Sequence, residues 1–270
     1  LHINVEVLIR CCMNKRKPNY QQNRRKKPSA GNQMVLYGQH AVRAALANPK
    51  RQNLRLFASK NAARDLQADV GEIATPMTLL ENDKLTAMVP ADAVHQGLVL
   101  ETEPLTPLTL DALIARGKLI IILDQVSDPR NVGAILRAAA VFGAGGIVMT
   151  RHNSPPAMGS LAKTASGALE FVPLVEVTNL ARALREIQQS GYLTVGLDEM
   201  GADLIDNVSR DRPIACVMGA EGKGLRRLTR ETCDVLARLP VASEADGSSF
   251  ATLNVATAAA VTLYALTRSL

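Results

Sequence analysis

An arginine inside an apolar helix is the first residue whose chemistry needs an explanation. Arg137 stands on the second turn of a helix that the apolar spacing predicts over residues 132–142, and Asn131 is placed to cap that helix. A guanidinium is always charged and offers five donors, so a phosphate, a developing alkoxide or a carboxylate is a natural partner. Two interpretations stay open: Arg137 meets an anionic group of a substrate, or it forms a structural ion pair with Glu221.

Two further stretches combine polar side chains with apolar or glycine-rich surroundings. Thr252 and Asn254 open a helix of small apolar residues that has no face suited to water, so we expect it to be buried or to lie at an interface. The simplest role of either residue is to cap the first turn. Glu221 stands in the segment 219–224, which lacks the Lys-Ser or Lys-Thr of a P-loop and the last glycine of GxGxxG. The segment is therefore not a generic phosphate-binding loop.

The elements that must position these residues alternate in a regular way. Apolar strands alternate with helices, which predicts a parallel sheet covered on both faces. Ligands of such sheets bind at the carboxyl ends of the strands, where the loops 124–131, 219–224 and 240–254 fall. The predicted strands are 119–123, 146–149, 173–177, 192–197, 214–218 and 235–239, and the predicted helices are 132–142, 158–169, 180–190 and one that starts at 225.

The chain before this sheet divides into three predicted regions. Residues 1–33 form a disordered basic arm, residues 34–102 a small α/β domain, and residues 103–117 a linker that contains two prolines. Residues 118–270 form the larger domain. Within the small domain the predicted helices are 38–47, 62–68 and 79–88, and the predicted strands are 54–58 and 97–100.

The distribution of charge favours a nucleic acid as partner. The chain has a net charge of +6, and between Val7 and Arg64 it has fourteen Lys and Arg and no Asp or Glu. Such a field of one sign suits a polyphosphate backbone. A solvated disordered tail is the alternative for the arm, and an anionic membrane is a weaker one because the arm has almost no residue to insert.

Composition excludes several other classes. The 270 residues are 47% hydrophobic but contain no apolar run long enough to span a membrane, and we expect a cytoplasmic protein. The four cysteines form no CxxC pair, so we expect no metal site and no disulfide framework. Cys216 is expected in the core. His95 either packs or touches RNA, and packing is favoured.

The three polar stretches resemble the ordered motifs of a known family. Residues 131–137, 217–225 and 252–256 resemble the three motifs of the SpoU-type RNA 2'-O-methyltransferases, which belong to the TrmH family and the knotted SPOUT superfamily. Upstream segments resemble the bacterial enzymes of this family that methylate a guanosine of large-subunit (23S) ribosomal RNA. Those segments are 36–38, 41–42, 94–97, 165–170 and 172–173.

The resemblance implies a fold, a cofactor and an assembly. The fold would be α/β, with a parallel-sheet catalytic domain closed by a deep trefoil knot and preceded by the small substrate-binding domain. The active unit would be a homodimer that uses S-adenosylmethionine and no metal, with the cofactor against the backbone around Gly219, Leu239 and Leu253.

The resemblance also implies a role for each polar residue. Arg137 and Asn131 would face the target ribose, with Glu221, Thr252 and Asn254 completing the site. Arg137 would orient and stabilise the developing alkoxide, and whether it also accepts the proton stays open. The family usually has Ser where Thr252 stands, and loop 241–250 is longer than usual.

We therefore expect a methyltransferase acting on the ribose 2'-hydroxyl of a guanosine in 23S ribosomal RNA. The alternatives are a transfer RNA 2'-O-methyltransferase with the same motifs and a non-catalytic RNA-binding protein of ribosome assembly.

Overall fold

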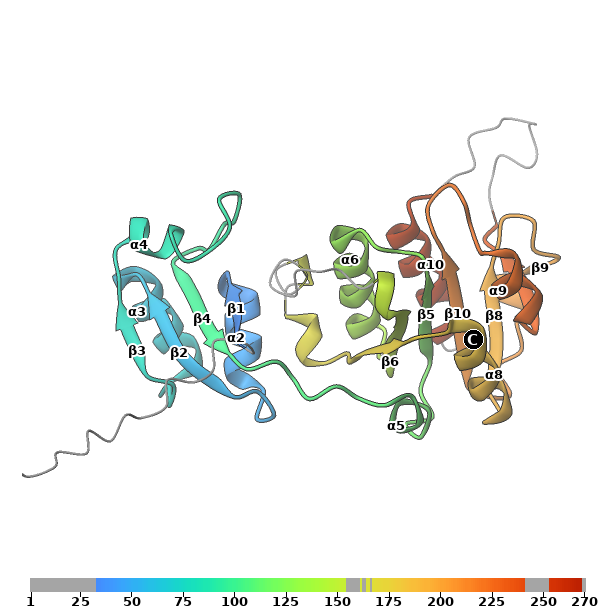
Figure 1. Cartoon of the computed structure of the whole chain (residues 1–270), viewed down its shortest axis with the longest axis horizontal. Coiled ribbons are helices and arrows are strands. Elements are labelled where there is room, and N and C mark those ends of the chain that lie inside the picture. Colours follow the sequence, from blue (N-terminus) through green and yellow to red (C-terminus); the bar gives the residue numbers. More distant parts are fainter. Residues whose placement is uncertain (1–32, 154–160, 162–163, 166, 241–252, 269–270) are drawn as a thin grey trace, which may run out of the picture. The chain divides into compact units, whose positions relative to one another are not determined.

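Two β-sheets organise the protein (Figure 1). The structure is a computed structural model, and it describes residues 33–153, 161, 164–165, 167–240 and 253–268. The first sheet has four strands in the order β1-β4-β2-β3, and β4 pairs antiparallel with both β1 and β2. Its elements are β1 (Met34–Tyr37), α2 (Gln39–Ala47), β2 (Asn53–Ala58), α3 (Lys60–Val70), β3 (Met77–Leu79), α4 (Asn82–Thr86) and β4 (Leu98–Thr102).

One predicted helix of this first unit is wrong. The structure confirms the helix 38–47 and the strands 54–58 and 97–100 as α2, β2 and β4, with ends shifted by one or two residues. Residues 79–88, however, divide between the end of β3 and the short helix α4. The pairing of Met77 with Leu56 of β2 extends the chain here, so a tertiary contact overrides the helical spacing.

The second sheet is parallel in every pairing within the described residues. Its seven strands follow the order β7-β6-β5-β10-β8-β11-β9, with β5 and β10 adjacent at the centre. The strands are β5 (Ile120–Asp124), β6 (Gly146–Thr150), β7 (Leu174–Val177), β8 (Leu193–Leu197), β9 (Asp203–Leu204), β10 (Ile214–Gly219) and β11 (Val235–Arg238). The helices are α5 (Leu110–Ile114), α6 (Pro129–Val141), α8 (Leu180–Gln189), α9 (Arg227–Thr232) and α10 (Val255–Thr267), with 3-10 turns η1 (Arg151–Asn153), η2 (Ala168–Glu170) and η3 (Ile205–Asn207).

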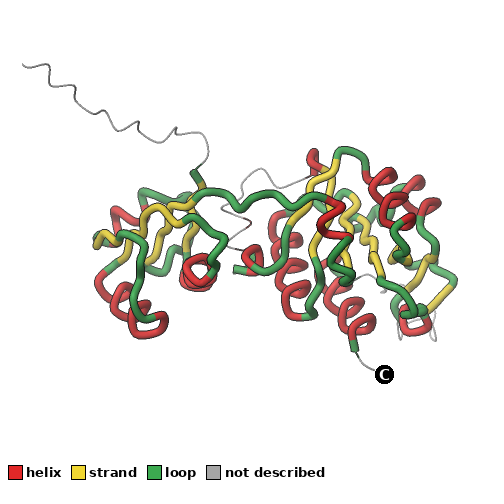
Figure 2. The backbone as a smooth tube through the Cα atoms, turned by 90° about the horizontal axis from the view of Figure 1, so that it is seen from below, coloured by secondary structure: helices red, strands yellow, loops and turns green. Residues whose placement is uncertain are grey.

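Alternate residues of the central strands face two different cores. Ile121 and Leu123 of β5 pack with α6 and α10, whereas Ile120 and Ile122 pack with α5 and α8. Helices therefore cover both faces of the sheet, as Figure 2 shows, and the predicted α/β architecture is confirmed. All six predicted strands are present. Half of the predicted helix 158–169 lies outside the described residues, and its last two residues belong to the 3-10 turn η2.

A buried ion pair fixes the 3-10 turn η2. The side chains of Arg51 and Glu170 are only 2% and 3% exposed, and Asn48 Nδ2 also donates to Glu170 at 2.7 Å. Arg51 Nη1 donates to the backbone oxygen of Glu103 at 2.9 Å, so the guanidinium has partners on two segments. Just before η2, a Cβ at Gly167 would lie 2.6 Å from a side chain of α2, which explains the glycine.

The helices are short compared with a lipid bilayer. Among the residues that the structure describes, no helix is long and apolar enough to cross a membrane.

Candidate active site

The carboxyl ends of β5 and β10 bring two of the polar loops together. In the parallel register Gly219 lies opposite Asp124, so the loop before α6 and the loop 219–224 leave the sheet side by side. This edge of the sheet is the position at which parallel α/β sheets bind ligands.

Three amide and carboxylate side chains meet at this edge. Asn254 Nδ2 lies 3.2 Å from Asn131 Oδ1 and 3.3 Å from Glu221 Oε2, and Asn131 Nδ2 lies 3.5 Å from the same Glu221 oxygen. The residues come from the starts of α6 and α10 and from the loop after β10. Asn131 is half-buried and the other two are exposed, so the Asn131–Glu221–Asn254 cluster is open to a ligand.

Each asparagine relates differently to the helix that it begins. Asn254 does cap α10, because its Oδ1 accepts from the backbone N–H of Ala256 at 2.9 Å, while its amide nitrogen reaches the cluster. The capping role expected for Asn131 is wrong: Asp128 caps α6 and accepts from the backbone N–H of Arg130 at 2.8 Å. This hydrogen bond lowers the pKa of the Asp128 carboxyl below its usual value. Asn131 therefore does not cap the helix, and its side chain contacts Glu221 instead.

Arg137 lies apart from this cluster within one chain. It follows Asn131 by six residues, which on an α-helix is a rise of about 9 Å and a rotation of about 240°. Its side chain is exposed and forms no hydrogen bond or ion pair with the described residues. The ion pair with Glu221 therefore does not form in this chain, where Glu221 is bonded to the two asparagines instead.

The loop after β10 folds back tightly on the strand end. Gly224 N donates to Ala220 O at 2.8 Å, and a Cβ at Gly219 would lie 2.1 Å from the carbonyl carbon of Gly224. Gly222 and Gly224 have φ angles of 76° and 62°, in the left-handed region that favours glycine. The glycines thus allow Glu221 to be presented at the tip of a closed turn.

A buried carboxylate that sequence reasoning missed holds the far end of this loop. Asp124 is fully buried, and its two oxygens accept from Arg226 N at 3.0 Å and Arg226 Nε at 2.6 Å. The ion pair joins the end of β5 to the residue before α9. The only sequence signal was an Asp at the end of an apolar strand, and the Arg lies 102 residues further on.

The remaining predicted site residues surround the same edge. Leu239 directly follows β11 and is half-buried, and Leu253 precedes α10 with 47% of its surface exposed. Both leave apolar surface available to a ligand. Thr252 and loop 241–250 lie outside the described residues.

Cys216 lies in the core of the second sheet. Burial raises the pKa of the Cys216 thiol to about 12, so this thiol is an inert core residue, as expected. Within the part of the chain that the structure describes, no three His, Cys, Asp or Glu side chains are grouped so as to hold a metal ion.

The sequence and the fold together define the family. Residues 118–264 match the SpoU rRNA Methylase family, and residues 35–108 match the family described as RNA 2'-O ribose methyltransferase substrate binding. The chain belongs to the SpoU rRNA methylase family.

Named relatives are similar over most of their length. The chain is 40% identical to the 23S rRNA (guanosine-2'-O-)-methyltransferase RlmB of Ralstonia nicotianae, over 87% of this chain and 95% of that protein. It is 37% identical to the protein of the same name from Pseudomonas putida, over 86% and 95%.

Solved structures share the fold. The SpoU methyltransferase AviRb from Streptomyces viridochromogenes, in complex with the cofactor AdoMet, superposes with a TM-score of 0.72 at 23% identity, covering 87% of this chain and 89% of that one. An AdoMet-bound rRNA methyltransferase from Sinorhizobium meliloti gives 0.71 at 21% identity, with 87% of both chains covered.

Proposed function

We propose that this protein transfers the methyl group of S-adenosylmethionine to the ribose 2'-hydroxyl of a guanosine in 23S ribosomal RNA. The proposal rests on one observation: the side chains of Asn131, Glu221 and Asn254 contact one another at the carboxyl edge of the parallel sheet. The names of its relatives, 37% and 40% identical over nearly their whole length, support the same substrate. We place the reaction in the cytoplasm, where ribosomal RNA matures in bacteria.

The cofactor fits the apolar and backbone-lined part of this edge. The closed turn at Gly219 packs main chain against main chain, and Leu239 and Leu253 add apolar surface. These three residues would hold S-adenosylmethionine, and Thr252 would complete the site. When bound, the sulfonium supplies an electrophilic methyl group.

The chain's own groups orient the acceptor. The ribose would have to be held with its 2'-hydroxyl in line with the methyl group, and the hydroxyl proton would have to pass to a base or to water. The Asn131 and Asn254 amides and the Glu221 carboxylate offer donors and acceptors to a ribose or base. Arg137 would stabilise the developing alkoxide, because its guanidinium remains charged as the oxygen becomes negative.

The position of Arg137 supports a homodimer. Arg137 and Val141 lie one turn apart on the exposed side of α6, and Val141 is 78% exposed. The neighbouring α10 exposes Val261 and Tyr264 at 43% and 54%. Covering this apolar face with a second copy would bring Arg137 into an interface and next to the partner's surface.

The self-association can be tested separately from catalysis. Val141→Glu should shift the protein from dimer to monomer in light scattering, whereas Met200→Glu, at a residue 84% exposed elsewhere, should not. A Val141→Glu variant that stays dimeric would remove this face as the interface.

The domain division belongs to the same proposal. We propose that residues 34–102 bind the RNA, that 103–117 connect, and that 118–270 form the catalytic domain with its trefoil knot. The arm 1–33 would add phosphate contacts.

The deciding experiment offers the protein labelled S-adenosylmethionine with either unmodified 23S ribosomal RNA or bulk transfer RNA. Label in the ribosomal RNA, lost in Arg137→Ala and in Asn131→Ala, is the expected result. Arg182→Ala is the matched control, since Arg182 is an exposed arginine on α8, on the other face of the sheet.

The other outcomes overturn the proposal in different ways. Label only in transfer RNA would keep the reaction and replace the substrate. Label in neither RNA, together with no binding of S-adenosylmethionine, would favour the non-catalytic role in ribosome assembly.

A further inference from the structure

The unit built on the four-stranded sheet contains a cleft that shares no lining residue with the candidate active site. The cleft has a volume of about 550 Å³, and the first turns of α2 and α3, the start of α4 and the loop 93–97 line it. This volume is in the usual range for small-molecule sites. Its polar lining includes Gln39, Asn61, Asp65, Asn82, His95 and Gln96.

The loop 93–97 holds its shape through its own hydrogen bonds. His95 Nδ1 accepts from Gly97 N at 3.0 Å, and His95 Nε2 lies 3.1 Å from Thr86 Oγ1. The His95 ring therefore braces the loop, in agreement with the packing role favoured from the sequence. Gln96 Oε1 accepts from the backbone N–H of Gln39 at 3.0 Å, which ties the loop to the first turn of α2.

The loop 93–97 also contains a residue in a strained backbone conformation. Gln96 has a φ of 52°, a left-handed conformation that residues with a side chain adopt rarely and at a cost. The next residue, Gly97, also has a positive φ, and a Cβ there would lie 2.5 Å from Ser59 Oγ. Because hydrogen bonds hold the loop 93–97 in this strained conformation, its shape is already set before a ligand binds.

The charges in the cleft argue against a phosphate as that ligand. Among the described residues no Lys or Arg lines the cleft, and Asp65, whose side chain is 55% exposed and lies 3.5 Å from Arg64 Nε, offers carboxylate acceptors rather than donors. The amides of Asn61 and Asn82 and the Asp65 carboxylate instead match the donors and acceptors on the edge of a nucleobase. Val94, 62% exposed, adds apolar surface against which a ring can pack.

We propose that this cleft binds one unpaired base of the RNA substrate and prefers guanine. Proteins read RNA sequence mainly from unstacked bases, by hydrogen bonds to their edges. Guanine alone among the four bases presents two adjacent N–H donors on its Watson–Crick edge, which a carboxylate such as Asp65 accepts together. The proposal rests on the proposed RNA substrate and adds where, and by which base, the RNA is recognised.

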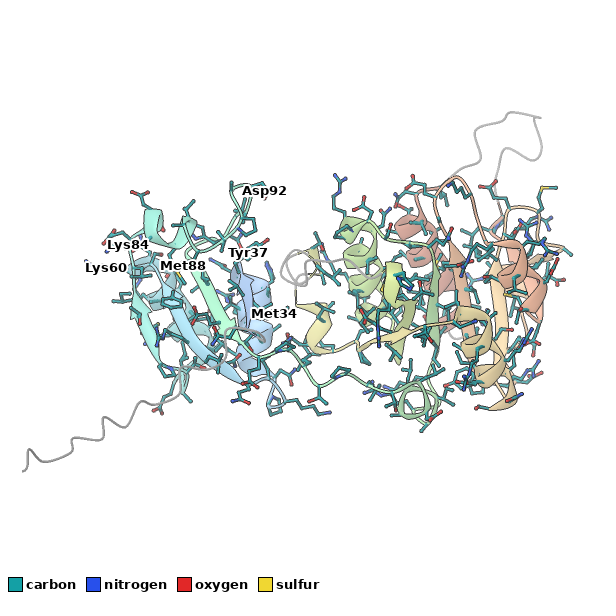
Figure 3. All side chains as sticks on the ribbon, in the orientation of Figure 1. Met34, Tyr37, Lys60, Lys84, Met88 and Asp92 are labelled. Atoms are coloured by element: carbon teal, nitrogen blue, oxygen red, sulfur yellow. The ribbon has the colours of Figure 1, made fainter. Side chains whose placement is uncertain are left out.

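Two lysines outside the cleft are available to bind the phosphates on either side of that base. Lys60 directly precedes Asn61, and Lys84 lies in α4 two residues after Asn82. Figure 3 shows both lysines on the same side of this unit. They would hold the backbone of the RNA while the cleft reads the base.

The test measures binding without methyl transfer. The full-length protein is titrated at one salt concentration with short labelled single-stranded RNAs that differ only in one central base, and fluorescence anisotropy gives each Kd. We expect the guanine RNA to bind about tenfold more tightly than the uracil RNA, as for a well-matched base contact. Asp65→Asn should abolish this preference by weakening the guanine RNA and leaving the uracil RNA unchanged.

Two variants complete the design. Asn61→Ala should weaken binding of the guanine RNA, whereas Gln67→Ala, which removes an exposed amide from the same helix outside the cleft, should not. Equal Kd values for all four RNAs, or an unaltered preference in Asp65→Asn, would overturn the proposal. A guanine preference in a protein that transfers no methyl group would overturn the proposed function and leave the cleft assignment standing.

Discussion

Gly219 offers the sharpest test of how the loop after β10 builds the site. In Gly219→Ala the new Cβ would lie 2.1 Å from the carbonyl carbon of Gly224 and 2.4 Å from Leu225 N, all of it backbone. Ordinary contact begins at 3.4 Å, so the loop has to retreat by about 1.3 Å, the difference between these distances. A side chain could turn away, but a peptide group inside a closed turn cannot. The hydrogen bond from Gly224 N to Ala220 O must break or stretch.

The expected cost has two parts. Overpacking of this kind costs about 1–3 kcal/mol of unfolding free energy, and contact with backbone places Gly219→Ala at the upper end. Retreat of the loop also displaces the main chain at Gly219 that would hold the cofactor, so affinity for S-adenosylmethionine should fall by at least about tenfold, equivalent to 1.4 kcal/mol. Urea denaturation measures the first quantity and isothermal titration calorimetry the second.

Gly222→Ala is the matched control, because it makes the same chemical change three residues along the same loop. No atom lies within 4 Å of a Cβ at Gly222, and its φ of 76° leaves only backbone strain of about 1–2 kcal/mol. We expect Gly222→Ala to retain cofactor binding. If Gly219→Ala matched Gly222→Ala in both stability and affinity, the closed turn would not be what shapes the cofactor site.

Four further outcomes can be checked on the same protein. Asp128→Ala should lower the unfolding free energy by about 1 kcal/mol in urea, because α6 loses its cap, and Asp128→Asn should restore most of it. Glu170→Gln should cost about 3 kcal/mol by leaving the buried Arg51 without its counter-ion; a change below about 1 kcal/mol would show that this pair is solvated. Since folding raises the pKa of Cys216 from 9.0 to about 12, the folded protein keeps a proton that the unfolded chain releases. Stability should therefore fall as the pH rises above about 9, by up to about 1.4 kcal/mol per pH unit, and Cys216→Ala should be less sensitive. Deleting residues 15–27 should flatten the dependence of RNA binding on salt, whereas an unchanged slope would make the arm a solvated tail.

The parallel sheet was predictable because both of its faces are buried. Residues 119–123 form a continuous apolar run, and the side chains of residues 120–123 pack alternately into the two helix-covered cores. Strands β1, β3 and β9 were not predicted; β9, for example, has two residues and exists only through its pairing with β11. Pairings of this kind are tertiary and leave no local pattern.

The sequence predicted which residues of the candidate site lie together, but not the geometry in which they meet. The sequence motifs identified Asn131, Glu221 and Asn254, and the structure brings these three together. The cap of α6 was missed although Asp128 and Pro129 carry the usual signal for a helix start. The position of Arg137 outside the cluster follows from the helix period, which predicts that residues six apart face different directions.

The positive charge of the chain is concentrated in the arm, whereas the cleft and the Asn131–Glu221–Asn254 cluster lie in the remainder of the chain. The first 32 residues have eight Lys and Arg against one Glu, a net charge of +7, while the whole chain has +6, so residues 33–270 carry a net −1. The part of the chain with the cleft and the cluster therefore gains little from the phosphate backbone as a whole. Beyond local phosphate contacts such as those proposed for Lys60 and Lys84, its affinity comes from oriented hydrogen bonds, which discriminate between bases and between hydroxyl groups, whereas the arm can attract any RNA. Specificity should accordingly survive at salt concentrations that weaken overall binding.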